Sequence, residues 1–130
     1  MRHARGLALL GAASALAGCG ASTSQQVQAK LQQFAHSVAR RDAAMLCRQV
    51  LAPSLVQRFA AAGIGCEQAM RTYFQSVTAP TLSVSKVTVH GTTASAVVLT
   101  GARGQQAALE SVQLINTRNG WRLVSLATPR

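Results

Sequence analysis

The sequence predicts an α+β domain in which N-terminal helices pack on a curved four-stranded antiparallel sheet. Up to Val77 the apolar residues recur every three to four positions, as on one face of a helix. From Thr81 onward they alternate with polar residues, and β-branched side chains become common. Short turn sequences separate the alternating segments, so consecutive strands pair antiparallel, and the preceding helices cover one face of the sheet.

The helices are expected at residues 27–40, 43–51, 54–62 and 66–77. The apolar face of the first carries Val27, Leu31, Phe34 and Val38. Asp42 can cap the second helix with its side chain, and Pro53 suits the first turn of the third. Gly63 stops the third helix, and the fourth ends before Pro80.

The strands are expected at residues 82–89, 93–100, 106–116 and 121–127. In the first strand the alternation slips by one residue near Ser85 and Lys86, which predicts a β-bulge. Turns are expected at 90–92 and 101–104. Between the last two strands, Arg118-Asn119-Gly120 is a strong hairpin signal.

This order of elements resembles the NTF2-like superfamily, in particular small actinobacterial-type lipoproteins of unknown function. The resemblance rests on Arg-Arg-Asp-Ala-Ala at 40–44, which opens the second helix, and on Gly-Trp-Arg-Leu-Val-Ser-Leu at 120–126 as the final strand. It implies a cone-shaped domain over residues 27–130 with a pocket between sheet and helices. Members of the superfamily use that pocket for catalysis, ligand binding or dimerisation, so the fold alone selects no function.

The first twenty residues indicate export. Arg2 and Arg5 precede an apolar run over 6–17, which is too short to span a bilayer and ends in Leu-Ala-Gly-Cys at 16–19. This ending resembles the lipobox of bacterial lipoproteins, in which the cysteine is diacylated and becomes the new N-terminus. The resemblance implies a signal peptide at 1–18, a lipid on Cys19, a polar lipidated tether at 19–26, and attachment to the extracytoplasmic face of the cell membrane. The alternative is an ordinary signal peptide with an incidental Cys19.

With Cys19 assigned to lipid, Cys47 and Cys66 remain as an even pair in an oxidising compartment. We expect them to form a structural disulfide. Free thiols, a metal site and a redox pair are the alternatives. The last two lack support, because the two cysteines form no Cys-x-x-Cys motif and no histidine lies at ligand spacing.

The chain is strongly basic, with 13 Lys and Arg against 3 Asp and Glu and a net charge of +10. Lys30 and Lys86 are the only lysines, and alanine is abundant, so the charge can reflect the bias of a GC-rich genome. The alternative is attraction to anionic lipid headgroups or an acidic envelope polymer. Nucleic acid is not expected as a partner, because no basic patch is interleaved with aromatic residues.

Few side chains offer catalytic chemistry. Enzymes that resemble this domain use a pocket carboxylate or histidine together with a tyrosine or a second acid. Here Asp42 is better explained as a helix cap, and Glu67 as a favourable charge in the first turn of its helix. Glu110 lies in the third strand, where solvent is favoured over the pocket for its side chain.

The remaining candidates are histidines and aromatic residues. His36 is expected on the polar face of the first helix, and His90 at a turn. Tyr73 is expected to be buried with its hydroxyl bonded to backbone, with a pocket hydrogen-bond donor as the alternative. Trp121 is expected to pack over the end of the sheet. Tyr73, Glu110 and Trp121 are therefore the pocket candidates, and no catalytic residue, cofactor or metal site is predicted.

Three functions follow from these residues. The leading one is a non-catalytic, membrane-anchored lipoprotein that binds a protein or envelope component, with a homodimer through the sheet permitted by the apolar residues on both faces of the strand at Val97, Val98 and Leu99. The second is a carrier or sensor of a small apolar ligand in the cone. The small residues that could leave room for such a ligand are Ala94, Ala96, Ala107 and Ala108. The third is a pocket enzyme built on Glu110, Tyr73 or His90.

Overall fold

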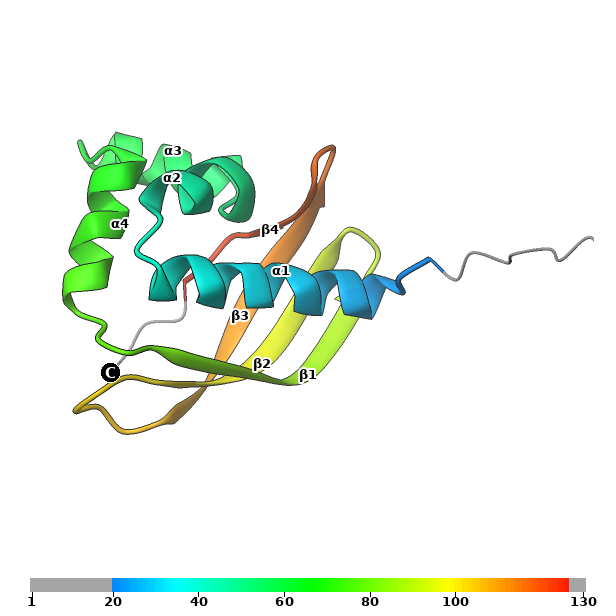
Figure 1. Ribbon diagram of the computed structural model, residues 1–130. Coiled ribbons are helices and arrows are strands. Elements are labelled where there is room, and N and C mark those ends of the chain that lie inside the picture. Colours follow the sequence, from blue (N-terminus) through cyan, green and yellow to red (C-terminus); the bar gives the residue numbers. More distant parts are fainter. Residues whose placement is uncertain (1–19, 127–130) are drawn as a thin grey trace, which may run out of the picture.

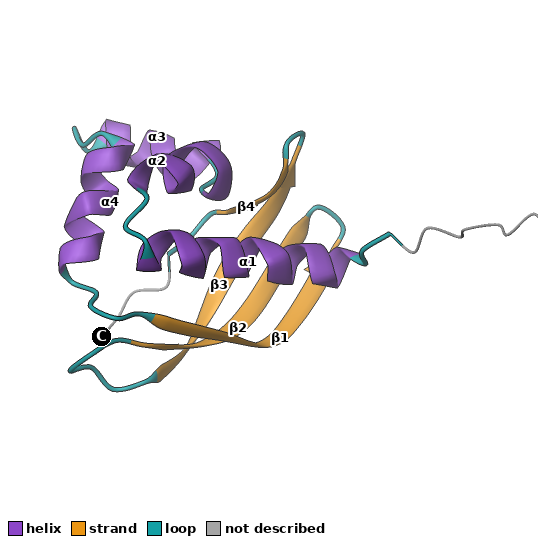
Figure 2. Ribbon diagram, viewed as in Figure 1, coloured by secondary structure: helices purple, strands orange, loops and turns teal. Residues whose placement is uncertain are grey.

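Helices come first and a four-stranded sheet follows in the computed structural model, which describes residues 20–126 (Figure 1). The helical elements are α1 (Thr23–Ala39), α2 (Ala43–Met45), the π-helical turn η1 (Leu46–Val50), α3 (Pro53–Ala61) and α4 (Cys66–Gln75). The strands are β1 (Thr81–His90), β2 (Thr93–Gly101), β3 (Ala108–Thr117) and β4 (Gly120–Leu123). The two layers, α1 across one face of the sheet and the other helices gathered at one end, are visible in Figure 2. This confirms the α+β class.

The sheet has the order β1-β2-β3-β4, and every neighbouring pair is antiparallel. The register of β1 against β2 shifts between Val84 and Lys86, which confirms the predicted bulge at Ser85. Burial alternates along β2 and β3, so one face of each strand is covered by helices and the other is open to solvent.

The last strand is shorter than predicted, because β4 ends at Leu123 instead of extending to residue 127. On its outer edge the Ala52 N–H donates to the Leu123 carbonyl at 2.7 Å, and Leu51 forms an isolated parallel bridge with Leu123. Beyond it, the hydroxyl of Ser125 accepts the Gln113 N–H at 3.1 Å. The Ser125 hydroxyl thus replaces the backbone carbonyl that would accept the Gln113 N–H if the strand continued. Residues 127–130 lie outside the described part of the chain.

The first helix begins at Thr23, four residues before the predicted start at Val27. The Ser22 hydroxyl accepts the Gln25 N–H at 3.2 Å, and the Gln25 side chain accepts the Ser22 N–H at 2.9 Å. This capping box satisfies two N–H groups at the helix start. The predicted tether at 19–26 was therefore wrong in its second half: of its described residues, only Gly20, Ala21 and the cap Ser22 precede the helix. Cys19 lies outside the described residues.

The second predicted helix consists of α2 and η1. The Asp42 carboxylate accepts the Met45 N–H at 3.0 Å, which confirms its role as a cap. At the other end the Leu51 N–H donates to the Leu46 carbonyl at 2.9 Å, so the last turn is wide. Two cations cover carbonyl groups of this turn, Lys30 on that of Gln49 at 3.0 Å and Arg122 on that of Arg48 at 2.7 Å.

The core lies between α1 and the covered face of the sheet. Its members from the helices include the predicted α1 face, and those from the sheet include small alanines. The principal side chains are Val27, Leu31, Phe34, Val38, Leu46, Val50, Met70, Phe74, Ala94, Ala96, Val98, Val112, Leu114, Trp121 and Leu123. Ala94 and Ala96 are fully buried in this cluster, so they pack against neighbours.

The predicted disulfide is present and joins Cys47 in η1 to Cys66, the first residue of α4. It connects two helical elements separated by α3 in the sequence. None of the helices within residues 20–126 combines the length and the apolar character that crossing a membrane would require.

Candidate functional site

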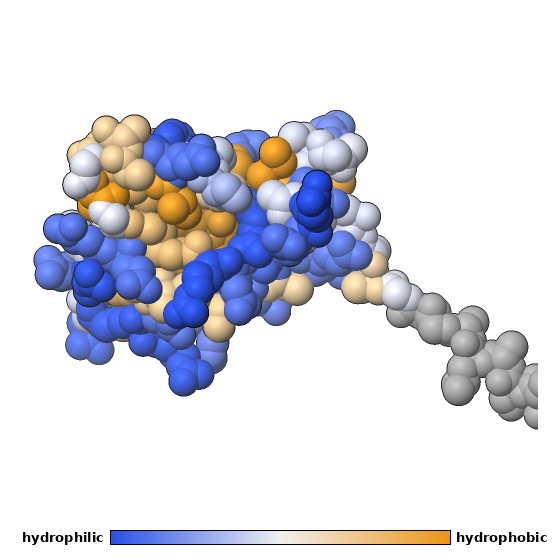
Figure 3. Space-filling model, turned by 90° about the horizontal axis from the view of Figure 1, so that it is seen from above, coloured by the Kyte–Doolittle hydropathy of each residue, from blue (hydrophilic) through white to orange (hydrophobic). Residues whose placement is uncertain are grey.

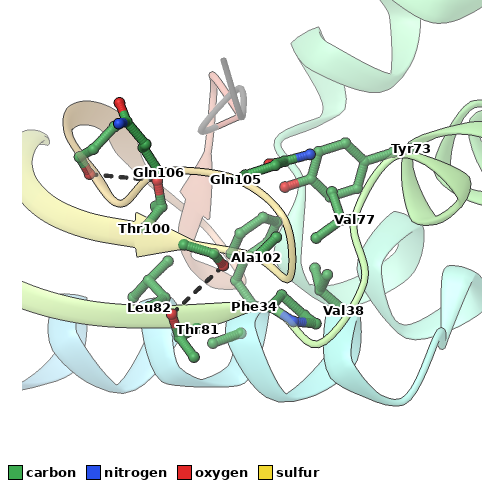
Figure 4. A pocket seen from close by; sticks show the side chains of 14 residues that line it. Phe34, Val38, Tyr73, Val77, Thr81, Leu82, Thr100, Ala102, Gln105 and Gln106 are labelled. Atoms are coloured by element: carbon green, nitrogen blue, oxygen red, sulfur yellow. Dashed lines mark hydrogen bonds between the residues drawn. The ribbon is translucent and has the colours of Figure 1, made fainter.

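A small cavity lies at the end of the cone where β1 begins and β2 ends (Figure 4). Its lining residues come from α1, the C-terminal half of α4, the α4–β1 connection, the start of β1, the end of β2, the β2–β3 connection and the first residue of β3. The lining is Phe34, Ala35, Val38, Tyr73, Val77, Pro80, Thr81, Leu82, Thr100, Gly101, Ala102, Gln105, Gln106 and Ala108. The cavity has a volume of about 40 Å³. That is space for a few water molecules, whereas small-molecule sites occupy roughly 300–1,000 Å³.

The β2–β3 connection closes this end of the cone. The Gln105 side-chain amide donates to the Ser76 carbonyl at 3.0 Å, and the Arg103 N–H donates to the Thr78 carbonyl at 2.7 Å. Both acceptors lie just after α4, so the connection is fastened across the opening between helix and sheet. The cone is therefore largely filled by the chain's own residues.

Tyr73 is the pocket candidate that the structure places at the cavity. It lies on α4, with its ring centroid 6.4 Å from that of Phe74. Burial raises the pKa of the Tyr73 phenol to about 12, and the negative charge of Glu110 contributes a smaller part of the increase. The hydroxyl is therefore protonated at neutral pH and able to donate a hydrogen bond.

Glu110 is not solvent-facing, and the expectation that favoured solvent was wrong. In β3 the residues with the parity of Val112 and Leu114 face the helices, and Glu110 shares it. Its register partner in β2 is the fully buried Val98. The side chain is half-buried, and its Oε2 is buried without a hydrogen-bond partner. The carboxylate does not line the small cavity.

Trp121, His36 and His90 do not line the cavity. Trp121 is 3% exposed and packs in the core, where its indole N–H has no acceptor. His90 is exposed at the far end of β1 from Thr81, which lines the cavity. His36 is exposed on α1 beside Arg40, with Nε2 and Nη1 3.4 Å apart. Of the three residues of the enzyme hypothesis, Glu110 and Tyr73 interact electrostatically, whereas His90 lies apart from both the cavity and this pair.

Residues 20–126 contain no group of three His, Cys, Asp or Glu side chains arranged to hold a metal ion. Glu67 is exposed in the first turn of α4, as expected for a charge that complements the helix dipole.

A larger, open groove was not predicted. It has a volume of about 490 Å³ and lies between the η1–α3 segment and the β3–β4 turn. The lining residues are Cys47, Arg48, Leu51, Pro53, Val56, Gln57, Thr117, Arg118, Asn119 and Arg122. These residues come from segments about sixty positions apart, so no local pattern in the sequence indicates the groove. Figure 3 looks down on the helices and shows apolar surface bordered by hydrophilic side chains.

The outer face of the sheet carries an exposed apolar pair. Leu99 and Leu109 are register partners in β2 and β3, and they are 43% and 69% exposed. The middle of the same face is polar, because the Gln113 amide donates to the hydroxyls of Ser95 and Ser111, each at 3.3 Å. The most exposed apolar pair on this face therefore lies at the end of the sheet that adjoins the β2–β3 connection, and Ile115, 36% exposed, lies at the other end of β3.

Comparison with known proteins identifies the fold. No family model and no curated protein matches the chain. Among solved structures, it is similar to an NTF2-like protein of unknown function from Silicibacter pomeroyi, with 15% identity, a TM-score of 0.55, and coverage of 76% of this chain and 87% of that one. It is also similar to an NTF2-like protein of unknown function from Shewanella baltica, with 14% identity, a TM-score of 0.55, and coverage of 76% of this chain and 86% of that one.

A third similar structure is a Streptomyces avermitilis protein named a "putative dehydratase from the NTF2-like family", with 17% identity, a TM-score of 0.50, and coverage of 78% of this chain and 90% of that one. At these identities the likeness establishes the fold. The chain has an NTF2-like α+β fold, as the resemblance in its sequence implied.

Proposed function

We propose that this chain is a membrane-anchored lipoprotein on the extracytoplasmic face, and that its NTF2-like domain binds a protein or envelope component without catalysis. The lipobox-like ending at Cys19 supports the anchor. Helix α1 begins at Thr23, so a lipid on Cys19 would hold the folded domain close to the membrane surface.

The observation that carries the non-catalytic role is the filled cone. A cavity of about 40 Å³ leaves no room for a substrate, whereas the exposed Leu99 and Leu109 offer a contact surface on the outside of the sheet. The same observation disfavours a carrier of an apolar ligand in the cone, because Ala94 and Ala96 are covered by packed side chains.

The anchor is tested by Cys19→Ala in the producing bacterium. Loss of the acylated sulfur removes two acyl chains, so the variant should leave the membrane fraction while the unaltered chain remains in it. The matched control is Ser24→Ala, which changes a nearby residue in the first turn of α1 and keeps Cys19. Retention of the Cys19→Ala protein in membranes would contradict the proposal.

A pocket enzyme is the second candidate, and the buried, unpartnered Oε2 of Glu110 is the observation that favours it. Native mass spectrometry of protein purified from its own host distinguishes the two. The non-catalytic proposal expects the bare mass of the chain and its lipid. A small molecule that co-purifies with the unaltered chain but not with Glu110→Gln would contradict the non-catalytic proposal and favour the pocket enzyme.

A further inference from the structure

The open groove beside the β3–β4 turn is electropositive. Three arginines line it, Arg48 from η1, Arg118 from the turn and Arg122 from β4, and its lining contains no acid. The three acids of the chain are placed elsewhere, Asp42 at the start of α2, Glu67 in α4 and Glu110 beneath the helices. Within residues 20–126, none of the groove arginines forms an ion pair with a carboxylate.

Local structure holds Arg122 and Arg118 in place. The Arg122 Nη1 donates to the Arg48 carbonyl at 2.7 Å, while its Nε is buried without an acceptor. Arg118 lies in a tight turn in which Gly120 adopts a φ of +99°. The Thr117 hydroxyl donates to the Gly120 carbonyl at 2.8 Å and accepts the Asn119 N–H at 3.2 Å. The positive groups are thus presented by ordered backbone.

The positive field extends to Lys30 on α1. Burial lowers the pKa of the Lys30 ammonium, and the charge of Arg122 lowers it further. This ammonium and the Arg122 guanidinium are occupied with carbonyls of η1. Arg48 and Arg118 are exposed, so their guanidinium groups are the ones available to an anion in the groove.

The groove also has an apolar part and a defined position. Leu51, Pro53 and Val56 line it together with the arginines. The β3–β4 turn lies at the same end of the molecule as the start of α1, to the right in Figure 1. Residues 20–22 precede α1 at this end and span at most about 10 Å, so a lipid attached directly before them would bring this end of the domain to the membrane surface.

We propose that this groove docks on the phosphate headgroups of anionic phospholipids in the membrane that anchors the chain. Guanidinium groups bind phosphate oxygens in a bidentate manner, and apolar residues beside them suit the boundary between headgroups and acyl chains. The inference rests on the proposed lipid anchor, because the anchor brings this end to the bilayer. Docking would orient the domain and leave the outer face of the sheet accessible.

The test measures headgroup preference in the full chain with Cys19→Ser as a common background, which excludes lipidation from the measurement. Dissociation constants are determined for phosphatidylcholine vesicles with and without phosphatidylglycerol, and their ratio is the readout. Contributions from residues 1–19 are shared by all variants and cancel in the comparison. The groove variant is Arg48→Gln with Arg118→Gln. The control, Arg71→Gln with Arg103→Gln, removes the same charge from exposed positions outside the groove.

The parent should prefer the anionic vesicles, and the preference should weaken with salt. Each groove arginine is expected to account for about fivefold of the ratio, so the groove variant should lose about 25-fold. The control should change the ratio by less than about twofold. No preference in the parent, or equal losses in the two double variants, would overturn the proposal. Failure of the lipid anchor is seen separately, as membrane retention of Cys19→Ala.

Discussion

Glu110 shows how the register of a strand overrules an assignment made from residue type alone. A glutamate in an amphipathic strand is ordinarily assigned to the solvent face. However, Val112 and Leu114 are buried under the helices, and side chains alternate between the two faces of a strand. Glu110, two residues before Val112, therefore points to the same helix-covered face. Its charge then contributes to the raised pKa of the Tyr73 phenol. The two side chains are electrostatically linked although only Tyr73 lines the cavity.

The phenol of Tyr73 predicts an alkaline loss of stability. Its pKa is about 12 in the folded chain and about 10 in an unfolded one, so above pH 10 the unfolded state loses a proton that the folded state keeps. The free energy of unfolding should therefore fall between pH 10 and 12. Urea unfolding at pH 9, 10 and 11 should show this slope in the unaltered chain and a smaller one in Tyr73→Phe.

Lys30 changes the free energy of unfolding in the opposite direction over the alkaline range. The effect of Tyr73 must therefore be measured as the difference between the unaltered chain and Tyr73→Phe. Its pKa is lowered in the folded state, so the unfolded chain holds that proton to higher pH, and stability rises as pH passes from the lowered value to about 10.5. This contribution is common to both proteins and cancels in their difference. Parallel pH curves for the unaltered chain and Tyr73→Phe would contradict the assignment.

At the scale of elements, the start of α1 depends on the Ser22 capping box. Ser22→Ala removes the acceptor of the Gln25 N–H and should lower the free energy of unfolding by about 1 kcal/mol. Ser24→Ala is the matched control, because it places a good helix former inside the first turn of α1, and it should not destabilise the fold. Equal effects of the two substitutions in urea unfolding would argue against the cap.

The disulfide joins η1 to α4 across 19 residues and should contribute about 3 kcal/mol by restricting the unfolded chain. Cys47→Ala combined with Cys66→Ala should lower the free energy of unfolding by that amount. Thiol labelling of the denatured, unreduced protein checks the pairing directly, since neither cysteine should react. Stoichiometric labelling of both would refute the bond, whatever the stability of the double variant.

The spacing of apolar residues predicted the helices and strands well, because each segment that buries one face carries apolar residues at its own helical or strand period. The bulge at Ser85 and the burial of Leu31 and Val98 follow from such patterns. Element ends were less predictable. Strand β4 stops at Leu123, where the Leu123 carbonyl accepts the Ala52 N–H and the Ser125 hydroxyl accepts the Gln113 N–H, and only the fold brings these partners together. The Ser-x-x-Gln signature at 22–25 was present in the sequence and could have located the start of α1.

The candidate site was harder to predict than the fold. Tyr73 could be proposed as a pocket residue because it is the only phenol, and the structure places it at the cavity. The size of that cavity depends on how the β2–β3 connection closes over it, which no single segment encodes. The groove escaped prediction for a similar reason, since Arg48 and Arg118 meet only when η1 packs beside the β3–β4 turn.

At the scale of the whole molecule, the sheet separates a helix-covered side from an outer face that is open to solvent. The helix-covered face holds the filled cone, and the groove beside it carries the arginines. The outer face carries few charges and ends in the Leu99 and Leu109 pair. A chain oriented on a membrane by its groove would present this outer face laterally, where a second copy anchored in the same bilayer is the most concentrated neighbour.

We therefore predict that the chain self-associates weakly through the outer face. The outer face of the four strands covers roughly 500 Å² per copy, so a symmetric pair buries roughly 1,000 Å², at the lower end of specific interfaces. Sedimentation velocity should show a dimer that forms as concentration rises. Leu109→Ser removes a leucine that is 69% exposed, the most exposed one within residues 20–126, and should shift the equilibrium to monomer. Ile64→Ser, at a 40% exposed residue in the α3–α4 connection, should not. A monomer at every concentration, or equal effects of the two variants, would assign the outer face to a different partner.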